Sequence, residues 1–176
     1  MKSCRPHSGR RDLRQSLKSE PLVQSDGNAM KAEIAFWDTS ALVPLCCGQA
    51  GPASRSRGLF RHFKKPVWWA TPVEIRSALV RLKQDGDLTE DQGRDAIRKW
   101  EMLELTVREV IPTEQVRGLA RAIPGRYQLR TLDSFQLAAA LVWCQEQPRR
   151  RPFICFDDRL ANAAESAGFV VHRLES

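Results

Sequence analysis

The sequence has no apolar run that approaches the ~18 residues needed to span a bilayer. Its five cysteines are an odd number, and none of them forms a CxxC pair. A disulfide framework or a zinc site is therefore not expected. The first residues are basic but lack the apolar segment of a secretory signal. Together these absences favour a protein of the reducing cytoplasm without a membrane partner.

Positive charge is concentrated at the start of the chain. The net charge is +7 over 176 residues, and residues 1–31 supply +4 of it, from seven Lys or Arg against three Asp or Glu. Residues 1–29 are polar and aperiodic, so we expect a disordered basic tail followed by one domain over residues 30–176. Two interpretations of the tail are open: a segment of no consequence upstream of a start at Met30, or a basic arm that touches nucleic acid.

Short apolar runs bounded by polar residues predict buried strands. The run Ile34–Trp37 stops at Asp38, and its length and composition are typical of a buried strand in a parallel sheet. A second short buried strand is predicted over residues 66–70, and further strands over 105–111, 153–156 and 169–171.

Segments with helical periodicity lie between these runs. They cover residues 53–63, 71–86, 89–104, 113–123, 131–146 and 157–168, with a shorter helix or turn over 39–45 that Pro44 interrupts. Pro124 and Gly125 are expected to break the helix that begins at Thr113. The helix over 131–146 is apolar nearly all round and is expected to be buried. Alternating strands and helices predict an α/β domain whose central parallel sheet is covered on both faces.

Four acidic residues stand where a predicted strand ends or a predicted helix begins: Asp38, Glu74, Asp133 and Asp157. Each has an ordinary explanation in helix capping. Glu74 ends the stretch Thr71-Pro72-Val73-Glu74, which matches a capping box. Asp133 falls in a first helical turn, and Asp38 and Asp157 or Asp158 stand at N-cap positions.

Taken together, the four acids have a second interpretation. Strand ends of a parallel sheet lie at one edge, so the four side chains are expected to meet in one cleft. Clustered carboxylates repel one another unless a cation pairs them, and a site of oxygen ligands suits Mg²⁺ or Mn²⁺ rather than zinc. Such metals activate water and hold a phosphodiester during its hydrolysis. The sequence therefore predicts a metal-assisted phosphodiesterase.

Four short motifs, in this order, resemble those of the PIN domain family and its VapC-type ribonuclease toxins. They are Phe36–Leu42, Thr71–Leu79, Leu129–Ala140 and Phe156–Leu160 with Ala163–Ala164, within a match that spans about residues 31–174. The resemblance implies a three-layer α/β/α fold and a Mg²⁺- or Mn²⁺-dependent endoribonuclease acting on RNA as the toxin of a type II toxin–antitoxin pair. It also implies a VapB-type antitoxin partner and a homodimer.

The resemblance also assigns roles to residues. It implies Asp38, Glu74, Asp133 and Asp157 as catalytic acids, the three aspartates as metal ligands, and Thr39 or Ser40 as a supporting hydroxyl. The family often has Thr or Ser two residues before the last acid, where this chain has Cys155, a poorer hydrogen-bond donor that puts the support of Asp157 in doubt. Of the two neighbouring acids we assign Asp157 to the site and Asp158 to the exposed cap.

Arginines and tryptophans are the candidate RNA contacts. Arg130, three residues before Asp133, is the first candidate, followed by Arg76 and the run Arg149–Arg151. Tryptophans can stack on bases. Trp37, Trp68 and Trp69 lie in predicted strands, so core packing is expected for at least two of them.

Three alternatives to a toxin stay open on the sequence alone. One is a PIN nuclease in RNA processing, and another is a PIN-fold binding module without catalysis, against which the presence of all four acids argues. The third is a phosphoacceptor receiver domain, which also clusters acids at strand ends. It requires a lysine at a late strand end, and neither 153–156 nor 169–171 ends in one.

Overall fold

A sheet of five parallel strands lies at the centre of the computed structural model, which describes residues 34–48 and 52–173. The strands are β1 (Phe36–Trp37), β2 (Lys65–Trp68), β3 (Val107–Val110), β4 (Pro152–Cys155) and β5 (Val170–Arg173). Their order across the sheet is β3-β2-β1-β4-β5, and every neighbouring pair is parallel. The predicted parallel sheet is confirmed, whereas the predicted basic tail lies outside the described residues.

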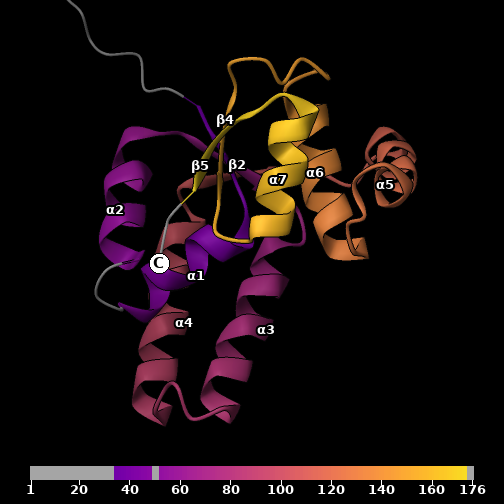
Figure 1. Cartoon of the computed structure of the whole chain (residues 1–176). Coiled ribbons are helices and arrows are strands. Elements are labelled where there is room, and N and C mark those ends of the chain that lie inside the picture. Colours follow the sequence, from indigo (N-terminus) through magenta and orange to yellow (C-terminus); the bar gives the residue numbers. More distant parts are fainter. Residues whose placement is uncertain (1–33, 49–51, 174–176) are drawn as a thin grey trace, which may run out of the picture. The chain divides into compact units, whose positions relative to one another are not determined.

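The helices connect the strands and flank the sheet (Figure 1). They are α1 (Thr39–Cys47), α2 (Pro52–His62), α3 (Thr71–Gln84), α4 (Glu90–Glu104), α5 (Glu114–Tyr127), α6 (Thr131–Trp143) and α7 (Asp158–Ala167). None of these described helices is long and apolar enough to cross a membrane.

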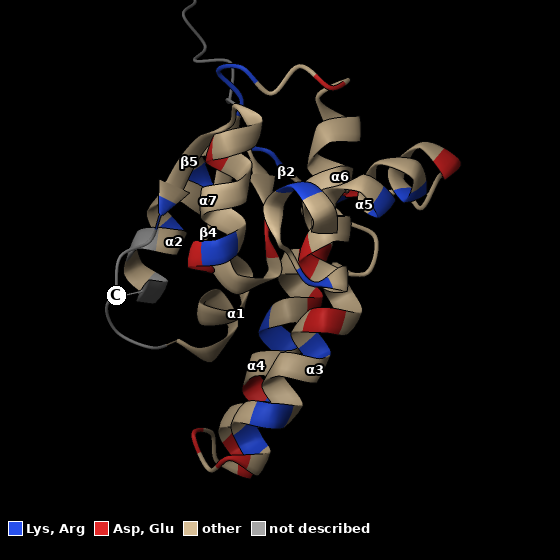
Figure 2. Cartoon of the chain, turned by 45° about the vertical axis from the view of Figure 1, so that its right-hand side comes forward, with Lys and Arg blue, Asp and Glu red and all other residues tan. Residues whose placement is uncertain are grey.

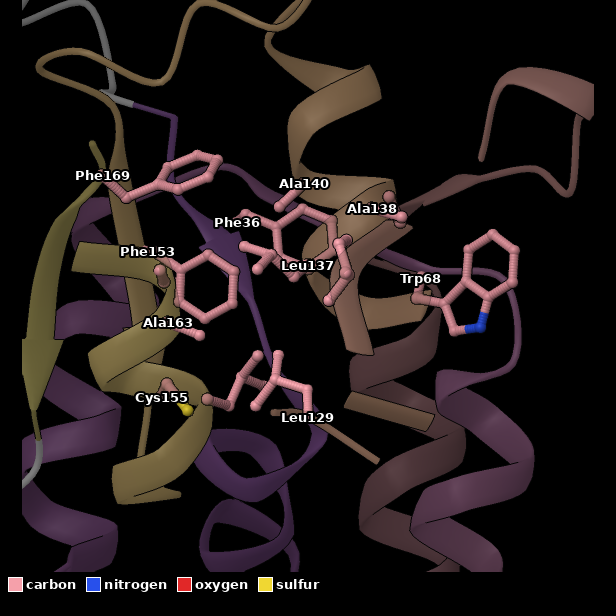
Figure 3. Packing of buried hydrophobic residues seen from close by; sticks show 14 of the residues in the cluster. Phe36, Trp68, Leu129, Leu137, Ala138, Ala140, Phe153, Cys155, Ala163 and Phe169 are labelled. Carbon is pink, nitrogen blue, oxygen red and sulfur yellow. The ribbon is translucent and has the colours of Figure 1, made fainter. Parts of the chain in front are cut away.

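Successive strand residues point to opposite faces of the sheet, and this alternation divides the core in two. Phe36 and Phe153 stack at 5.4 Å between ring centroids and pack, with Trp68, against α5, α6 and α7 (Figure 3). Trp37 and Ile154, one position further along each strand, pack instead against α1, α3 and α4. The chain therefore has the predicted three-layer α/β/α arrangement.

Two predicted helix interruptions are wrong. α1 runs through Pro44, because the burial of four of its side chains, Ala41, Leu42, Leu45 and Cys46, offsets the one backbone hydrogen bond that proline removes. α5 runs through Pro124 and Gly125 and ends only at Gln128, whose left-handed backbone (φ 55°) donates its N–H to the carbonyl of Pro124.

The buried helix predicted over 131–146 is confirmed in kind but not in extent. α6 ends at Trp143, and Cys144 is its C-cap. Its burial is also less complete than predicted, since Leu132 in its first turn is 58% exposed. Leu132 and Asp133 of that turn line a common cleft with Asp38, Ala70 and Asp157, which follow β1, β2 and β4.

The order of the strands fixes the point at which the sheet can bind a ligand. β1 pairs with β2 on one side and with β4 on the other, so the chain leaves β1 and β4 in adjacent positions. The backbone N–H of Asp38 donates to the carbonyl of Ile154 at 3.0 Å and holds the two strand ends together. From β1 the chain adds β2 and β3 on one side of the sheet and then β4 and β5 on the other, so the strand order reverses at β1. A crevice opens at the carboxyl ends of the strands where the order reverses in this way.

Candidate active site

A cleft of about 730 Å³ lies at this edge, and all four predicted acids line it. Asp38 follows β1, Glu74 lies in the first turn of α3, Asp133 in the first turn of α6, and Asp157 directly precedes α7. The remaining wall is largely apolar, with Val43, Val73, Leu82 and Leu132 among its residues. The structure therefore brings together acids that are up to 119 positions apart in the sequence.

Asp38 is the most deeply buried of the four acids, with 5% of its surface exposed. It is the N-cap of α1, and its Oδ2 accepts a hydrogen bond from the backbone N–H of Ser40 at 2.8 Å. Burial raises the pKa of Asp38 to about 6, against the hydrogen bonds from Ser40 that lower it, and the nearby charges of Glu74 and Asp133 raise it further. Asp38 thus caps α1 and lines the acidic cleft at the same time.

Asp157 is also both a cap and a cleft residue. Its Oδ1 accepts from the N–H of Leu160 at 2.8 Å, so Asp157 caps α7. Our assignment of the cap to Asp158 is therefore wrong: Asp158 is the first residue of the helix, outside the cleft, and pairs with Arg173 at 3.4 Å. Asp157, two residues after the end of β4, has the extended backbone that a cap requires.

The capping-box interpretation of Glu74 is wrong. The N-cap of α3 is Ala70 and makes no side-chain cap hydrogen bond. Thr71 is therefore the first helical residue and Glu74 the fourth, whereas a capping box pairs the cap with the third. Its Oε2 instead accepts two side-chain hydrogen bonds, from Thr39 Oγ1 at 2.6 Å and from Gln136 Nε2 at 2.9 Å. Its Oε1 is buried and has no hydrogen-bond partner among the described residues.

Gln136 is a site residue that the sequence analysis missed. It is 1% exposed, and its amide nitrogen also lies within hydrogen-bond distance of Thr39 Oγ1 (3.1 Å) and Thr71 Oγ1 (3.4 Å). It stands three residues after Asp133, which places both side chains on the same side of α6. The signal was a single amide in the apolar stretch Phe135–Ala140, where a buried polar group must have a partner.

Asp133 is half-buried in the first turn of α6. Burial raises its pKa, and the neighbouring charges of Asp157 and Glu74 raise it further, against a backbone hydrogen bond and the positive charge of Arg130, which lower it. Asp38 and Asp133 therefore both have raised pKa values for the same two reasons, removal from water and like charge.

The supporting residues contact the acids in different ways. Ser40 Oγ accepts a hydrogen bond from the backbone N–H of Phe156 at 2.8 Å and so joins α1 to the end of β4. The Sγ of Cys155 lies 3.8 Å from Asp38 Oδ2 and 3.3 Å from the backbone carbonyl of Asp157. The carboxylate of Asp157 is thus held by the backbone N–H of Leu160 and not by the thiol. Cys155, which stands where the family often has Thr or Ser, contacts the carboxylate of Asp38 instead.

The predicted RNA contacts lie in unequal positions. Arg130 is exposed next to Asp133, beside the cleft. Arg76 lies outside the cleft lining and pairs with Glu101 on α4 at 3.0 Å. The run Arg149–Arg151 precedes β4 and therefore lies at the opposite edge of the sheet.

The tryptophans follow the predicted division. Trp37 and Trp68 are core residues, at 0% and 5% exposure, as expected for two of the three. Trp69 follows the end of β2 and is 51% exposed. Only Trp69 of these three has a surface on which a base can stack.

The residues of the cleft fit a hydrated hard cation. The acids that line it offer only carboxylate oxygens, two of them carry pKa values raised by burial and by their neighbours, and one buried oxygen of Glu74 lacks a partner. Among the described residues no three His, Cys, Asp or Glu side chains lie close enough to ligate one ion jointly. Mg²⁺ usually keeps several waters and binds through one or two carboxylates, so it does not require a closer cluster.

The sequence matches no protein-family model and no curated protein. Solved structures show a similar fold. One is a toxin–antitoxin complex from Klebsiella pneumoniae, with a TM-score of 0.50 and 16% identity, covering 70% of this chain and 86% of the other. Another is PAE2754 from Pyrobaculum aerophilum, with a TM-score of 0.56 and 15% identity, covering 80% of this chain and 90% of the other. At these identities the likeness shows the α/β/α fold alone.

Proposed function

We propose that this chain is a metal-dependent endoribonuclease of the PIN family and the VapC-type toxin of a toxin–antitoxin pair. The observation that carries the proposal is the meeting of four carboxylates in one cleft, three from strand–helix junctions and Asp133 from the junction between α5 and α6. The raised pKa values of Asp38 and Asp133 support it, because a fold that crowds unpaired carboxylates gains stability when a cation binds there.

The chain's own residues position the acids for this reaction. One or two of Asp38, Asp133 and Asp157 would bind Mg²⁺ or Mn²⁺ directly and the rest through its bound waters, with Glu74 as the fourth acid of the site. The bound ion supplies activation of water and neutralisation of the phosphate charge. The backbone N–H groups of Ser40 and Leu160 fix Asp38 and Asp157, and Thr39 and Gln136 fix one oxygen of Glu74. Held in this way, the carboxylates need little rearrangement during the reaction.

The toxin role and its partner belong to the same proposal. The similar fold in a toxin–antitoxin complex supports an antitoxin partner for this chain, which the resemblance implies to be of the VapB type. A homodimer and a cytoplasmic location are further parts of the proposal. A PIN nuclease of RNA processing would use the same acids, and the two roles differ in whether an antitoxin blocks the activity.

The proposal is tested with the purified full chain and a single-stranded RNA. We expect cleavage with Mg²⁺ or Mn²⁺, little with Zn²⁺, and none in EDTA. The Asp133→Asn protein is expected to be inactive, while Asp158→Asn, an equal change outside the cleft, is expected to cleave normally. Cleavage at an undiminished rate in EDTA would overturn the metal mechanism. Growth arrest on expression of the wild type, but not of Asp133→Asn, tests the toxin role.

A further inference from the structure

A second hollow, of about 360 Å³, has the opposite chemistry from the acidic cleft. It lies between the end of α5 and one side of α7, and no carboxylate lines it. Its polar lining is two guanidinium groups, two amides and two hydroxyls, from Arg126, Arg159, Gln128, Asn162, Tyr127 and Ser166. Both arginines are exposed to solvent. The hollow therefore presents hydrogen-bond donors and positive charge to an anion.

The local backbone and an aromatic ring hold one side of this hollow. Gln128 ends α5 in the left-handed conformation, and its N–H donates to the carbonyl of Pro124 at 2.9 Å. The guanidinium of Arg126 lies 5.1 Å from the centroid of the Tyr127 ring. A cation over an aromatic face at this distance is attracted to it, so the charge of Arg126 has a preferred position.

Arg173 of β5 neutralises the acids on α7. Its guanidinium pairs with Glu165 at 2.8 Å and with Asp158 at 3.4 Å. In the part of the chain that the structure describes, neither Arg126 nor Arg159 forms an ion pair. The acids Asp158 and Glu165 of α7 therefore do not neutralise the two arginines of the hollow.

Arg173 also orients Asn162. Its Nη2 donates to Asn162 Oδ1 at 2.7 Å. A guanidinium can only donate, so the oxygen of this amide must face Arg173, and its NH₂ group is left as a donor for a ligand.

The hollow and the cleft both include residues at the start of α7. Asp157 caps α7 and lines the cleft, and Arg159, two residues later, lines the hollow. Residues two apart lie on different sides of a helix, so a nucleic-acid strand that contacts both Asp157 and Arg159 has to pass around the start of α7. Figure 2 shows acidic and basic residues side by side at the start of α7.

We propose that this hollow binds a backbone phosphate of the RNA substrate, with Arg126 and Arg159 as the principal contacts. The identity of the ligand rests on the proposed ribonuclease function. Guanidinium groups form paired hydrogen bonds with phosphate oxygens, and they also offset the repulsion between RNA and the acidic cleft. Because every nucleotide carries the same phosphate, the hollow contributes affinity and alignment of the strand, not sequence preference.

RNA binding by the double variant Arg126→Gln/Arg159→Gln tests this site without relying on catalysis. Fluorescence anisotropy in EDTA, over a series of salt concentrations, measures the Kd for a labelled single-stranded RNA. We expect binding about tenfold weaker, and a salt dependence of log K reduced by about 0.7 for each phosphate that the variant no longer neutralises. Arg121→Gln, at an exposed position of α5 outside the hollow, is the control for loss of a positive charge. Equal effects in Arg121→Gln and in the double variant would overturn the proposal.

Neutralising single phosphates identifies the one that is bound. RNAs with one methylphosphonate at successive positions should show a position where the wild type loses affinity and the double variant loses none. If no position shows this non-additivity, the hollow does not bind the backbone. Polyglutamate that competes as strongly as RNA of equal charge would assign the hollow to an acidic protein instead and overturn the RNA assignment. A chain that binds RNA in this pattern without cutting it would overturn the proposed function alone.

Discussion

Gln136 on α6 donates a hydrogen bond to the carboxylate of Glu74 on α3 at 2.9 Å, and this contact joins the two helical layers. α6 packs on one face of the sheet and α3 on the other, so their side chains meet only past the strand ends. Thr39 Oγ1, from the strand–helix junction between them, donates to the same oxygen of Glu74. The network places Glu74, a half-buried acid of the cleft, in contact with both layers.

Replacing Gln136 by Leu should damage the site more than the fold. Leucine has a similar bulk, but it leaves Thr39 as the only donor to Glu74 Oε2 among the described residues. We expect a loss of about 1–3 kcal/mol in the free energy of unfolding, and a fall of roughly 10–100-fold in the affinity for Mn²⁺. Chemical denaturation and calorimetric titration of Mn²⁺ measure the two effects.

The same change in a Glu74→Gln background separates positioning from simple damage. If Gln136 acts through Glu74, its removal should cost little further Mn²⁺ affinity once the carboxylate is gone. Gln115→Leu, which removes an exposed hydrogen bond to Glu146, is the matched control and should leave metal binding unchanged. Additive losses in the double variant would show that Gln136 acts by another route.

Asp→Asn substitutions distinguish capping from catalysis at Asp38, Asp133 and Asp157. Asn caps a helix about as well as Asp, so the caps of α1 and α7 survive the change while a charge is removed. Each variant should be nearly inactive yet at least as stable as the wild type without metal, because one repelling carboxylate is gone. Added Mg²⁺ should raise the Tm of the wild type more than that of the variants.

Asp158→Asn is the internal control for this series, since Asp158 lies outside the cleft and pairs with Arg173. It should match the wild type in activity and in its response to Mg²⁺. An inactive Asp158→Asn beside an active Asp157→Asn would reverse our assignment of these neighbours. Full activity in all three cleft variants would leave helix capping as the role of Asp38 and Asp157, and a favourable first-turn charge as that of Asp133.

The buried carboxyl of Asp38 should make the metal-free protein less stable as the pH rises. Its pKa is raised from 3.8 to about 6, so the folded state holds this proton more tightly than the unfolded state. Its contribution to the free energy of unfolding is therefore most favourable below about pH 4 and falls by about 3 kcal/mol as the pH rises to about 6 and beyond. The difference between the wild-type and Asp38→Asn stability curves, measured without metal, isolates this effect.

Cys155→Ser should lower the pKa of Asp38. The thiol sulfur is 3.8 Å from Asp38 Oδ2, and a hydroxyl is a stronger donor to a carboxylate than a thiol. The pH window in which Asp38 alters the stability should therefore move toward acid. Cys144→Ser, at a buried thiol that contacts the Leu141 carbonyl instead, should leave that window in place. A window that does not move in Cys155→Ser would show that the thiol has no influence on this acid.

The strands and the position of the cleft could be predicted because both depend on local pattern. Apolar runs that stop at Asp38 or Asp157 mark where buried strands end, and parallel pairing then places those ends at one edge. The helix boundaries at Pro44 and Pro124 could not be predicted in this way. There the packing of the surrounding helix outweighs a local preference that is worth a few kcal/mol.

The partners of the site residues depend on contacts that no local pattern contains. Thr71 to Glu74 has the sequence of a capping box, and only the position of Ala70 as the cap shows that Glu74 is turned toward Thr39 and Gln136 instead. The role of Gln136 depends on Glu74 and Thr39, which lie 62 and 97 positions away in the sequence. The choice between Asp157 and Asp158 as the cap depends on where β4 ends.

The position of β4 between β1 and β5 sets when the cleft can exist during synthesis. β4 begins only at residue 152, and Asp157 follows it, although Asp38 leaves the ribosome among the first residues of the sheet. A chain that stops before residue 152 has β1 as an open edge and lacks one wall of the cleft. Nascent or prematurely terminated chains that stop there therefore carry Asp38, Glu74 and Asp133 but lack the assembled cleft. The fourth acid, Asp157, is added only after β4 has been synthesised.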